Sequence, residues 1–285
     1  MQISFKEVSY SPARLSADGL KAVEALNFDV DKAGVTGIMG TADSGRRTVL
    51  LLLAAMLRPQ KGHVLINAED INSKKYKSRK DKPGCAFVLR DTDFLFYEKS
   101  VEREFDNILK KCELSAEDKK YRIVSALESV GLEAGAVLDL PPAALSKCDR
   151  YKLSLALAVA TEAEILLLEE PIEQLDAKGR DCFRELCRIL TAKGCYIFIS
   201  TNDADFIAEY GNQVLIMKNG SLIRSDTARL VFADYYYLIR NELPVPSVKT
   251  TIQRLHERDV NIPSNIVDYE QFIDRLKIIM WRKQR

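Results

Sequence analysis

The stretch GTADSGRRTVLLLL, residues 40–53, separates two glycines by four residues and then begins an apolar run. It follows GVTGIMG, residues 34–40, a short apolar segment that predicts a buried strand. A strand, a G-x-x-x-x-G loop and a helix form a cradle in which backbone N–H groups and the positive helix end bind phosphate. Such loops continue with Lys and then Ser or Thr, whereas this chain has Arg46 and Arg47. The stretch therefore predicts a phosphate-binding loop with altered chemistry.

Strand-like and helix-like segments alternate around this loop. Short apolar or alternating runs predict strands at residues 3–10, 22–30, 34–40, 62–71, 84–89, 164–171, 195–200 and 213–223. Apolar spacing and end signals predict helices at 46–57, 101–132, within 140–161, at 176–192 and at 203–209, with Ser115 and Asp118 as a capping box. The alternation predicts right-handed crossovers and an α/β fold with a mainly parallel sheet.

The composition is that of a globular chain without a strong overall field. The 285 residues are 47% apolar and carry a net charge of +1, which gives no argument for a nucleic-acid partner. The longest apolar run, residues 49–57, is shorter than the roughly 20 residues that span a bilayer. The N-terminus shows no signal pattern, and the six cysteines form no C-x-x-C pair, so we expect reduced thiols in the cytosol.

One segment is unusually basic. Residues 74–82 contain six Lys or Arg in nine positions. We expect a solvated loop here, because charge runs are commonly exposed. Contact with a phosphate or a lipid headgroup is the alternative.

The C-terminal end of the sequence predicts a separate small helical unit. NELPVPS, residues 241–247, predicts a linker, and 248–263 and 268–281 predict helices beyond it. We expect apolar residues at helical spacing to pack these helices against their own cassette or a partner; they are Ile252, Leu255, Phe272, Leu276 and Ile279.

Motifs further along the chain give the Gly40 loop a family context. ILLLEEPIEQLD, residues 165–176, resembles the Walker B and D-loop segment of ATP-binding cassette (ABC) ATPases, usually h-h-h-h-D-E-P-T-x-x-L-D. LSKCD, residues 145–149, stands where these proteins carry the L-S-G-G-Q signature. Residues 198–223 resemble their switch-histidine strand and the hairpin after it. The resemblance implies an ABC-type P-loop nucleotide-binding domain with a mixed, mainly parallel sheet, helices on both faces and a helical subdomain.

A narrower resemblance covers nearly the whole chain. Residues 88–105 resemble the Q-loop region of energy-coupling factor (ECF) ATPases, and residues 243–276 resemble their C-terminal extension. This implies an ABC domain over 1–240 with a helical subdomain at about 91–158, and an extension over 241–285. It further implies a cytoplasmic protein on the inner face of the membrane, in an importer of vitamins or metal ions. Its partners would be a second ABC ATPase, in a homo- or heterodimer, and a membrane coupling subunit.

The resemblance assigns site residues one by one. The nucleotide loop is Gly40, Thr41, Ala42, Asp43, Ser44, Gly45, Arg46, Arg47 and Thr48, with Tyr10 as the aromatic nearest the adenine position at Pro12. Catalytic positions are Glu170 (base), Asn202 (switch) and Arg90 (Q-loop); Glu169 stands at the metal-ligand position. The signature is Ser146, Lys147, Cys148 and Asp149, and the D-loop is Leu175 and Asp176. Aromatics after the Q-loop, namely Phe94, Phe96 and Tyr97, are expected to dock the membrane partner.

The departures from the family pattern fall where the chemistry happens. Arg46 replaces a compact point charge with a larger planar fork, and Arg47 replaces the hydroxyl that ligates Mg²⁺. Asn202 replaces a histidine and carries no proton at neutral pH. We therefore expect weakened binding of ATP and Mg²⁺ and weakened or lost hydrolysis. We also expect an arginine of the loop to pair with Glu169 or Glu170.

Three functions remain open from the sequence. The first is a degenerate ECF-type subunit that pairs with a competent ATPase. The second is a working ATPase with unusual motifs, which Glu170 and the Leu175-Asp176 pair favour. The third is a regulatory or scaffold protein that has kept the ABC fold outside transport.

Overall fold

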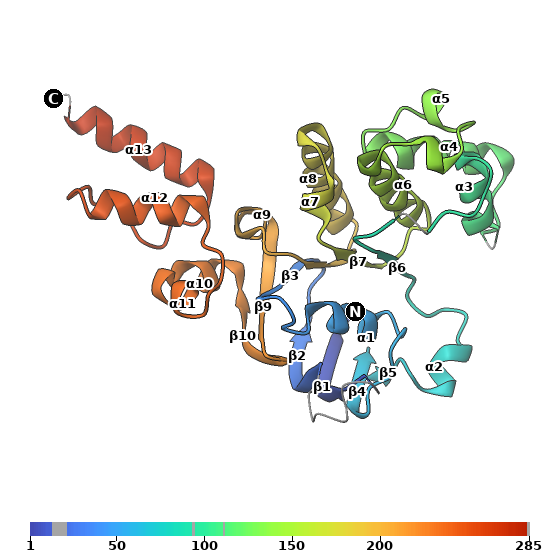
Figure 1. The fold of residues 1–285 in the computed structure, drawn as a ribbon, viewed down its shortest axis with the longest axis horizontal. Coiled ribbons are helices and arrows are strands. Elements are labelled where there is room, and N and C mark those ends of the chain that lie inside the picture. The colour runs from blue at the N-terminus through green and yellow to red at the C-terminus, as the bar shows by residue number, and fades with distance from the viewer. Residues whose placement is uncertain (13–21, 93–94, 111, 284–285) are drawn as a thin grey trace.

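The central layer of the protein is a six-stranded sheet. The computed structural model describes residues 1–12, 22–92, 95–110 and 112–283 (Figure 1). In spatial order the strands are β10 (Ser221–Thr227), β9 (Gly211–Lys218), β3 (Gly34–Gly40), β8 (Tyr196–Ser200), β7 (Ile165–Glu169) and β6 (Cys85–Val88). β10 pairs antiparallel with β9, and the other neighbours are parallel. The carboxyl ends of β3 and β7 therefore lie at the same edge, where the Gly40 loop meets Glu169.

A second, smaller sheet is wholly antiparallel. Its order is β2 (Val23–Val30), β1 (Ile3–Tyr10), β4 (Lys61–Ile66) and β5 (Glu69–Asp70). The prediction of one strand over 62–71 was wrong, because Asn67 and Ala68 take positive φ values of 50° and 63° and turn the chain into a hairpin.

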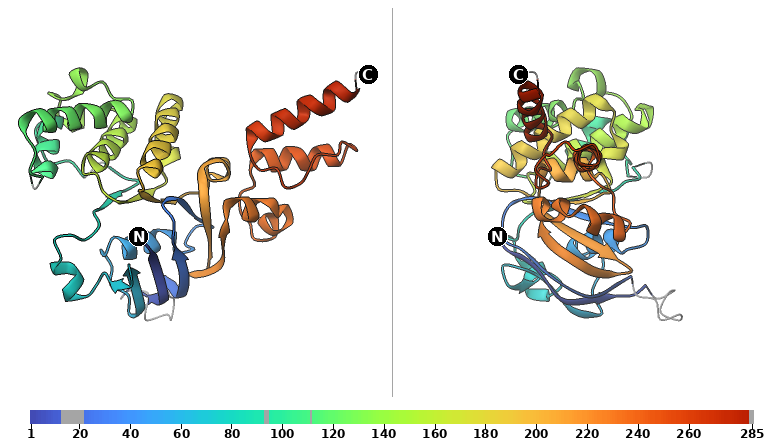
Figure 2. Two further views of the ribbon diagram at one scale, coloured as in Figure 1. Left: turned by 180° about the vertical axis from the view of Figure 1, so that it is seen from behind. Right: turned by 90° about the vertical axis from the view of Figure 1, so that its left-hand side faces the viewer.

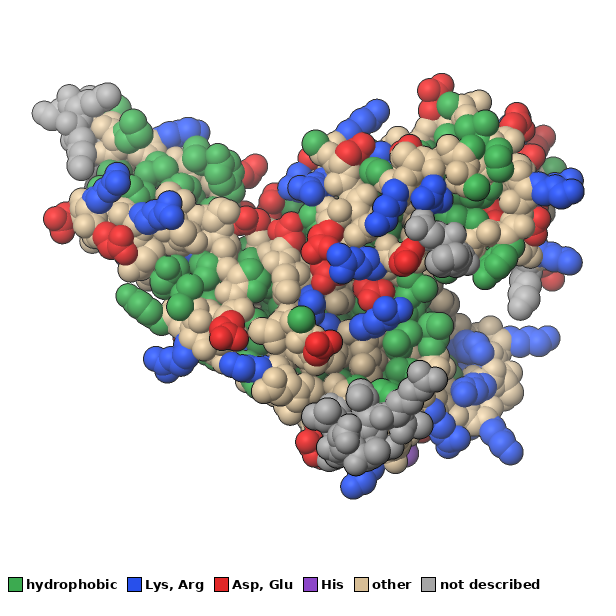
Figure 3. Space-filling model, in the orientation of Figure 1, with side chains coloured by type: hydrophobic (Ala, Val, Ile, Leu, Met, Phe, Trp, Pro, Cys, Tyr) green, Lys and Arg blue, Asp and Glu red, His purple; other side chains and the backbone are tan. Residues whose placement is uncertain are grey.

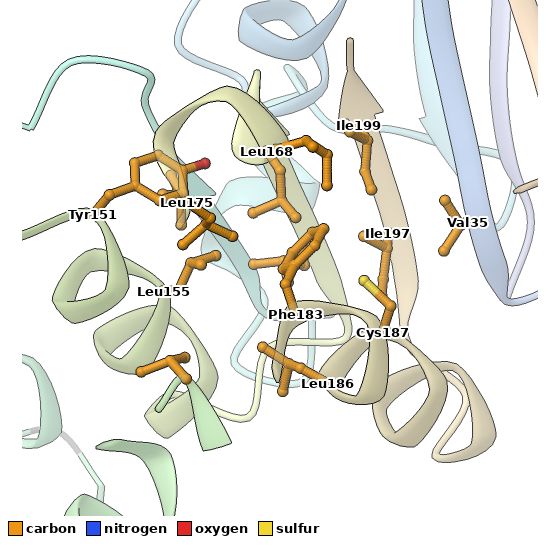
Figure 4. Packing of buried hydrophobic residues seen from close by; sticks show 14 of the residues in the cluster. Val35, Tyr151, Leu155, Leu168, Leu175, Phe183, Leu186, Cys187, Ile197 and Ile199 are labelled. Carbon is orange, nitrogen blue, oxygen red and sulfur yellow. The ribbon is translucent and has the colours of Figure 1, made fainter. Parts of the chain in front are cut away.

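The two faces of the six-stranded sheet belong to different cores. Along β7, Leu166 and Leu168 pack on the helical side, whereas Ile165 and Leu167 pack with helix α1 (Arg46–Leu53) and the antiparallel sheet. Figure 4 shows Leu168 among the side chains of the helical side, with Phe183 beside it. This alternation is what a strand buried on both faces requires.

Helices form the layer on the first of these faces and extend beyond it. They are α3 (Val101–Leu109), α4 (Ala116–Ser129), α5 (Ala134–Val137), α6 (Lys147–Ala160), α7 (Pro171–Gln174), α8 (Ala177–Ala192) and α9 (Ala204–Tyr210). The predicted capping box is confirmed, since the Asp118 backbone N–H donates to Ser115 Oγ at 3.0 Å. The single helix expected over 101–132 is interrupted between α3 and α4.

The C-terminal helices project from the end of the cassette (Figure 1). They are α10 (Ala228–Ala233), α11 (Tyr235–Arg240), α12 (Ser247–His256) and α13 (Tyr269–Lys283). All five apolar residues predicted for this piece join one small core, with Ile252 and Phe272 buried at its centre. These residues pack against one another in a local core, so the expectation that their apolar faces pack on the cassette was wrong. The buried Lys249 ties this core to α10, because Nζ donates to the carbonyl oxygens of Ala233 and Ser264.

Two further segments differ from expectation. The helix predicted over 46–57 ends at Leu53, because Ala55 adopts φ 54° and the Met56 N–H turns back to the Leu51 carbonyl. This is a Schellman ending without the usual glycine, so the stop expected at Arg58-Pro59 was placed too late. Residues 74–82 are not all loop, since they begin with the short helix α2 (Lys74–Ser78), which Ser73 caps.

Candidate nucleotide site

The loop after β3 keeps the backbone shape of a phosphate cradle. Gly40, Asp43 and Gly45 have φ values of 153°, 60° and 96°, which turn the chain tightly before α1. A Cβ at Gly40 would lie 2.1 Å from the Met217 carbonyl oxygen, so only glycine fits there. Ser44 Oγ is buried and has no hydrogen-bond partner among the described residues. A phosphate oxygen is the kind of group that such a hydroxyl would satisfy.

The first arginine of the loop is used inside the protein. Arg46 Nη1 donates to Glu170 Oε1 at 2.9 Å, and the two side chains are only 15% and 10% exposed. Glu170 follows β7 in the left-handed region at φ 47°, and its backbone N–H donates to the Ser200 carbonyl at 2.8 Å. The base position of the family is thus held in an ion pair with the Walker A position.

The second arginine reaches the other carboxylate. Arg47 Nε lies 3.4 Å from Glu169 Oε1, and the Arg47 side chain is 62% exposed. The other oxygen of Glu169 accepts the backbone N–H of Arg90 at 3.2 Å. The expected pairing of the loop arginines with Glu169 and Glu170 is confirmed, one arginine to each acid.

The Q-loop position joins the same ionic cluster. Arg90 Nη2 lies 3.0 Å from Glu173 Oε2 on α7. Three arginines therefore face three glutamates at the carboxyl edge of the sheet, and the sequence reasoning missed Glu173. Its position three residues after Glu170 was the available signal, because residues at this spacing share a helix face.

The switch position also contacts the loop. Asn202 follows β8, and its Oδ1 accepts the Gly40 backbone N–H at 3.3 Å. An asparagine here can hold the loop but cannot carry a proton at neutral pH.

Burial shapes the electrostatics of the base position. It raises the pKa of the Glu170 carboxyl above its ordinary value, and the Arg46 guanidinium opposes that shift only in part. Tyr151, fully buried on α6, donates its hydroxyl to the Glu169 carbonyl at 3.4 Å and packs below the two acids. The sequence reasoning did not single out this tyrosine, which stands between Arg150 and Lys152 at the start of the helix.

The residues fit a phosphate better than they fit a metal. The loop backbone and Ser44 suit phosphate oxygens, as described above. The position of the Mg²⁺-binding hydroxyl holds Arg47, and Glu169 is engaged by Arg47 and by the Arg90 backbone. No three His, Cys, Asp or Glu side chains gather as a metal site in the described part of the chain. A guanidinium thus occupies the position of the hydroxyl that would ligate Mg²⁺.

The remaining loop residues line the rim. Thr41 accepts the Ser44 N–H through its carbonyl at 3.3 Å, Ala42 is exposed, and Thr48 is half-buried on α1. Tyr10 pairs with Val23 across β1 and β2, and Val23 lies against Gly45. Tyr10, the candidate for stacking on adenine, is therefore separated from the loop by Val23. Pro12 is half-buried beyond the end of β1.

The signature residues lie at the start of α6. Ser146 caps the helix, accepting the Asp149 N–H at 3.1 Å and donating its hydroxyl to Asp149 Oδ2 at 2.7 Å. Lys147 is exposed and Cys148 half-buried. Lys152, which the sequence reasoning missed, lies 3.4 Å from Asp149 and 3.2 Å from Asp176. The structure therefore joins the signature to the D-loop.

The D-loop residues have different roles. Asp176 caps α8, accepting the Gly179 N–H at 2.6 Å, and this bond with the Lys152 pair lowers the pKa of Asp176. Leu175 is buried in the helical core.

The fold and these motif positions define an ATP-binding cassette. Residues 23–173 match the family model described as ABC transporter, and the chain therefore belongs to the ABC transporter family. It is 29% identical over 246 residues to the energy-coupling factor transporter ATP-binding protein EcfA of Methanocaldococcus jannaschii, covering 86% of this chain and 87% of the relative. It is 26% identical over 280 residues to EcfA2 of Symbiobacterium thermophilum, covering 98% and 97%.

A solved structure gives the same answer for the fold. The cbiO1 protein of Clostridium perfringens, described as part of the ABC transporter complex cbiONQ, superposes with a TM-score of 0.70. It is 25% identical, and the match covers 90% of this chain and 98% of cbiO1. Within the described ranges, no helix is both long and apolar enough to cross a membrane.

Proposed function

We propose that this chain is an ATP-binding-cassette subunit of an ECF-type importer of vitamins or metal ions. It sits at the cytoplasmic face of the membrane, paired with a second ABC ATPase beneath a membrane coupling subunit. Relatives named as energy-coupling factor ATP-binding proteins match it over nearly their whole length, which supports this assignment. The likeness to cbiO1, part of a transporter complex, supports an assembly with membrane components. The division into a cassette over 1–240 and an extension over 241–285 belongs to the same proposal.

The chain's own nucleotide site is closed, and the Arg46–Glu170 pair carries this part of the proposal. In a working site Mg²⁺ and the γ-phosphate lie between the loop and the Walker B acids. Here the guanidinium of Arg46 lies 2.9 Å from the acid that would polarise water. Mg-ATP would have to separate both Arg–Glu pairs before it could bind.

The energetic consequence is large. A hydrogen bond to a charged group contributes about 1.5–3 kcal/mol. Losing two or three of them weakens Mg-ATP binding by roughly 10² to 10⁶, at about 1.4 kcal/mol per tenfold. The partner ATPase therefore supplies the turnover, and this chain contributes structure and coupling.

A second function, a working ATPase with unusual motifs, is favoured by the loop itself. Glycines with positive φ turn the loop around a phosphate, and the Ser44 hydroxyl, which has no hydrogen-bond partner among the described residues, can donate to one. In that version both arginines turn outward and bind ATP phosphates without a metal.

Calorimetry of the full chain with ATP, with and without Mg²⁺, tests which version holds. We expect no heat of binding from the wild type, with or without the metal, up to about 1 mM ATP, the weakening estimated above. The double change Arg46→Lys, Arg47→Ser should restore measurable Mg-dependent binding, because it frees Glu170 and returns a metal-ligating hydroxyl. Turnover should stay low, since Asn202 and Arg90 remain.

A matched control makes the same two substitutions at arginines outside the nucleotide loop. Arg184→Lys with Arg188→Ser alters a half-buried and an exposed arginine of α8 and should leave binding unchanged. Micromolar, Mg-dependent binding to the wild type would contradict the closed site. Micromolar binding without Mg²⁺ would favour the second function.

The groove after the Q-loop is the proposed docking site of the membrane partner. A pocket of about 340 Å³ lies between Phe96, Tyr97 and the turn at Pro141 and Pro142. Tyr97 is 87% exposed, whereas Phe96 packs against the main core. Phe94 lies outside the described residues. Aromatics at a concave surface are typical anchors for a partner helix.

Co-purification from membranes tests this docking site and the assignment to a transporter. Tyr97→Ala should reduce recovery of the membrane subunit at least about tenfold, because interface aromatics commonly contribute 2 kcal/mol or more. Tyr121→Ala, which removes another exposed tyrosine from α4, is the matched control. Full recovery of the membrane subunit with Tyr97→Ala would contradict the proposed docking site. A chain that brings down no membrane protein at all would contradict the function.

A further inference from the structure

The basic segment of residues 73–82 has no role in the nucleotide site. It begins with α2 and leads into β6. In Figure 3, blue side chains gather at the lower right, over the place of α2 in Figure 1. What this patch of charge contacts is the question that the segment raises.

The segment is held as a fixed platform. The Tyr76 side chain is buried in the core that α1 shares with the antiparallel sheet, and Ser73 Oγ accepts the Tyr76 N–H at 3.1 Å. Arg79 links Glu69, which lies on β5, to Asp81 through ion pairs on both sides. A buried aromatic and a bridged arginine fix the backbone, so the remaining side chains project from a defined surface.

The charges of the segment are unbalanced. Six Lys and Arg stand against Glu69 and Asp81, which leaves a local charge of +4 in a chain of net charge +1. The two acids are engaged by Arg79 and Lys75. Within the described residues no ion pair engages the four other lysines, all of which are exposed: Lys74, Lys77, Lys80 and Lys82. Lys82 donates only to the Lys77 carbonyl, at 2.9 Å.

The position of α2 suggests the partner. Figures 1 and 2 place α2 at the same end of the long axis as α3 and α4, opposite α12 and α13. The groove at Phe96 and Tyr97 immediately precedes α3. If the membrane subunit sits in that groove, as the proposed function has it, the bilayer lies beyond this end of the molecule.

We propose that the four exposed lysines of residues 74–82 dock on anionic phospholipid headgroups. This inference rests on the proposed function for its geometry. Lysine suits a fluid, irregular layer of phosphates, because its ammonium is a point charge on a flexible stem. A cluster of four or more basic residues beside a bilayer is the pattern that anionic lipids attract.

Nucleic acid is the less favoured partner for the same patch. Proteins that bind single strands combine basic grooves with exposed aromatic rings on which bases stack. The only aromatic side chain in residues 73–82 is Tyr76, and it is buried. The patch therefore offers charge without a stacking surface.

Vesicle flotation with the full chain tests the proposal. The probes are phosphatidylcholine vesicles with and without about 30% phosphatidylserine, an anionic surface of the kind that attracts basic patches. Each lysine near such a surface strengthens binding by about fivefold, so Lys→Gln at all four positions should weaken binding by at least tenfold. The binding should fall as salt shortens the Debye length below about 8 Å. Pure phosphatidylcholine should bind neither protein.

The controls separate charge from folding. A second variant changes four dispersed lysines to Gln, at Lys32, Lys178, Lys193 and Lys277, all exposed and away from α2, α3 and α4, and should keep the wild-type affinity. Both variants should melt as the wild type does, because Tyr76 and Arg79 are untouched. Equal flotation of the wild type and the 74–82 variant would overturn the proposal. Tighter, lysine-dependent binding to RNA or DNA than to vesicles would overturn it as well.

The test needs neither ATP nor a partner chain. Failure of flotation with normal co-purification of the membrane subunit would sink the lipid contact and leave the proposed function standing. Flotation of the chain without co-purification of the membrane subunit would contradict the proposed function and leave the lipid contact standing.

Discussion

The nucleotide loop and the signature helix of this cassette hold their charged side chains in different environments. At the loop, Arg46 and Glu170 form a pair that is 15% and 10% exposed. At the signature, Ser146 and Asp149 cap α6, and Lys152 joins Asp149 to Asp176, which is 56% exposed. The loop keeps backbone geometry suited to phosphate, yet its arginines are paired with acids of the chain, as Lys152 is at the signature.

The difference in burial decides what each region contributes. A buried ion pair contributes little net stability when intact, but removing one partner leaves a charge without water or counter-ion. At the signature the two acids are hydrated, and Lys152, which is only 6% exposed, keeps one acid when the other is removed, so a single change there should cost about 1 kcal/mol. The loop should therefore respond strongly to single changes, and the signature weakly.

The largest expected effect follows from removing the buried guanidinium. Arg46→Ala should lower the free energy of unfolding by about 3 kcal/mol at pH 7, because Glu170 then stays buried without a cation. The loss should shrink as the pH falls. Without Arg46 the folded-state pKa of Glu170 rises further above its unfolded value, so the protonated, stable form is populated at low pH and lost as the pH rises through that pKa. Urea unfolding at pH 5 and pH 7.5 measures both.

The neighbouring arginine is the matched control for burial. Arg47→Ala removes the same group from the next position, but the Arg47 side chain is 62% exposed and lies 3.4 Å from Glu169, which is 10% exposed and keeps the hydrogen bond from the Arg90 backbone N–H. We expect a loss of less than about 1 kcal/mol, as for exposed pairs. Equal losses for the two changes would break the comparison, because burial would then not be the cause.

The signature side gives a smaller effect. Asp176→Ala removes the cap of α8 and one partner of Lys152, and should cost about 1–2 kcal/mol. Asp176→Asn keeps an oxygen for the Gly179 N–H and should recover most of that loss. Thermal unfolding of both variants beside Asp181→Ala, an exposed acid of the same helix, sharpens the comparison. A loss for Asp176→Ala larger than that for Arg46→Ala would contradict the ranking by burial.

The sequence predicted most of the elements because their signals are local. The strand GVTGIMG, the loop glycines and the run ILLLE depend on apolar pattern and backbone freedom, which neighbouring residues set. The missed features were not visible locally. The α1 ending uses Ala55 where glycine is usual, and α2 forms in a segment whose charges indicate a loop. Its stability comes from Tyr76, whose partners lie on other elements.

By itself the sequence determined the order of the motifs and which side chains had been replaced. Those facts established the cassette class and the loss of the Mg²⁺-binding hydroxyl, since they depend only on residue identity and spacing. Only the tertiary structure decided which arginine meets which acid. Arg46 and Glu170 are 124 residues apart, and they meet because parallel strands bring the carboxyl ends of β3 and β7 to one edge. It also decided that Arg90 reaches Glu173 and that Lys152 bridges two motifs, because ion pairs form between neighbours in space.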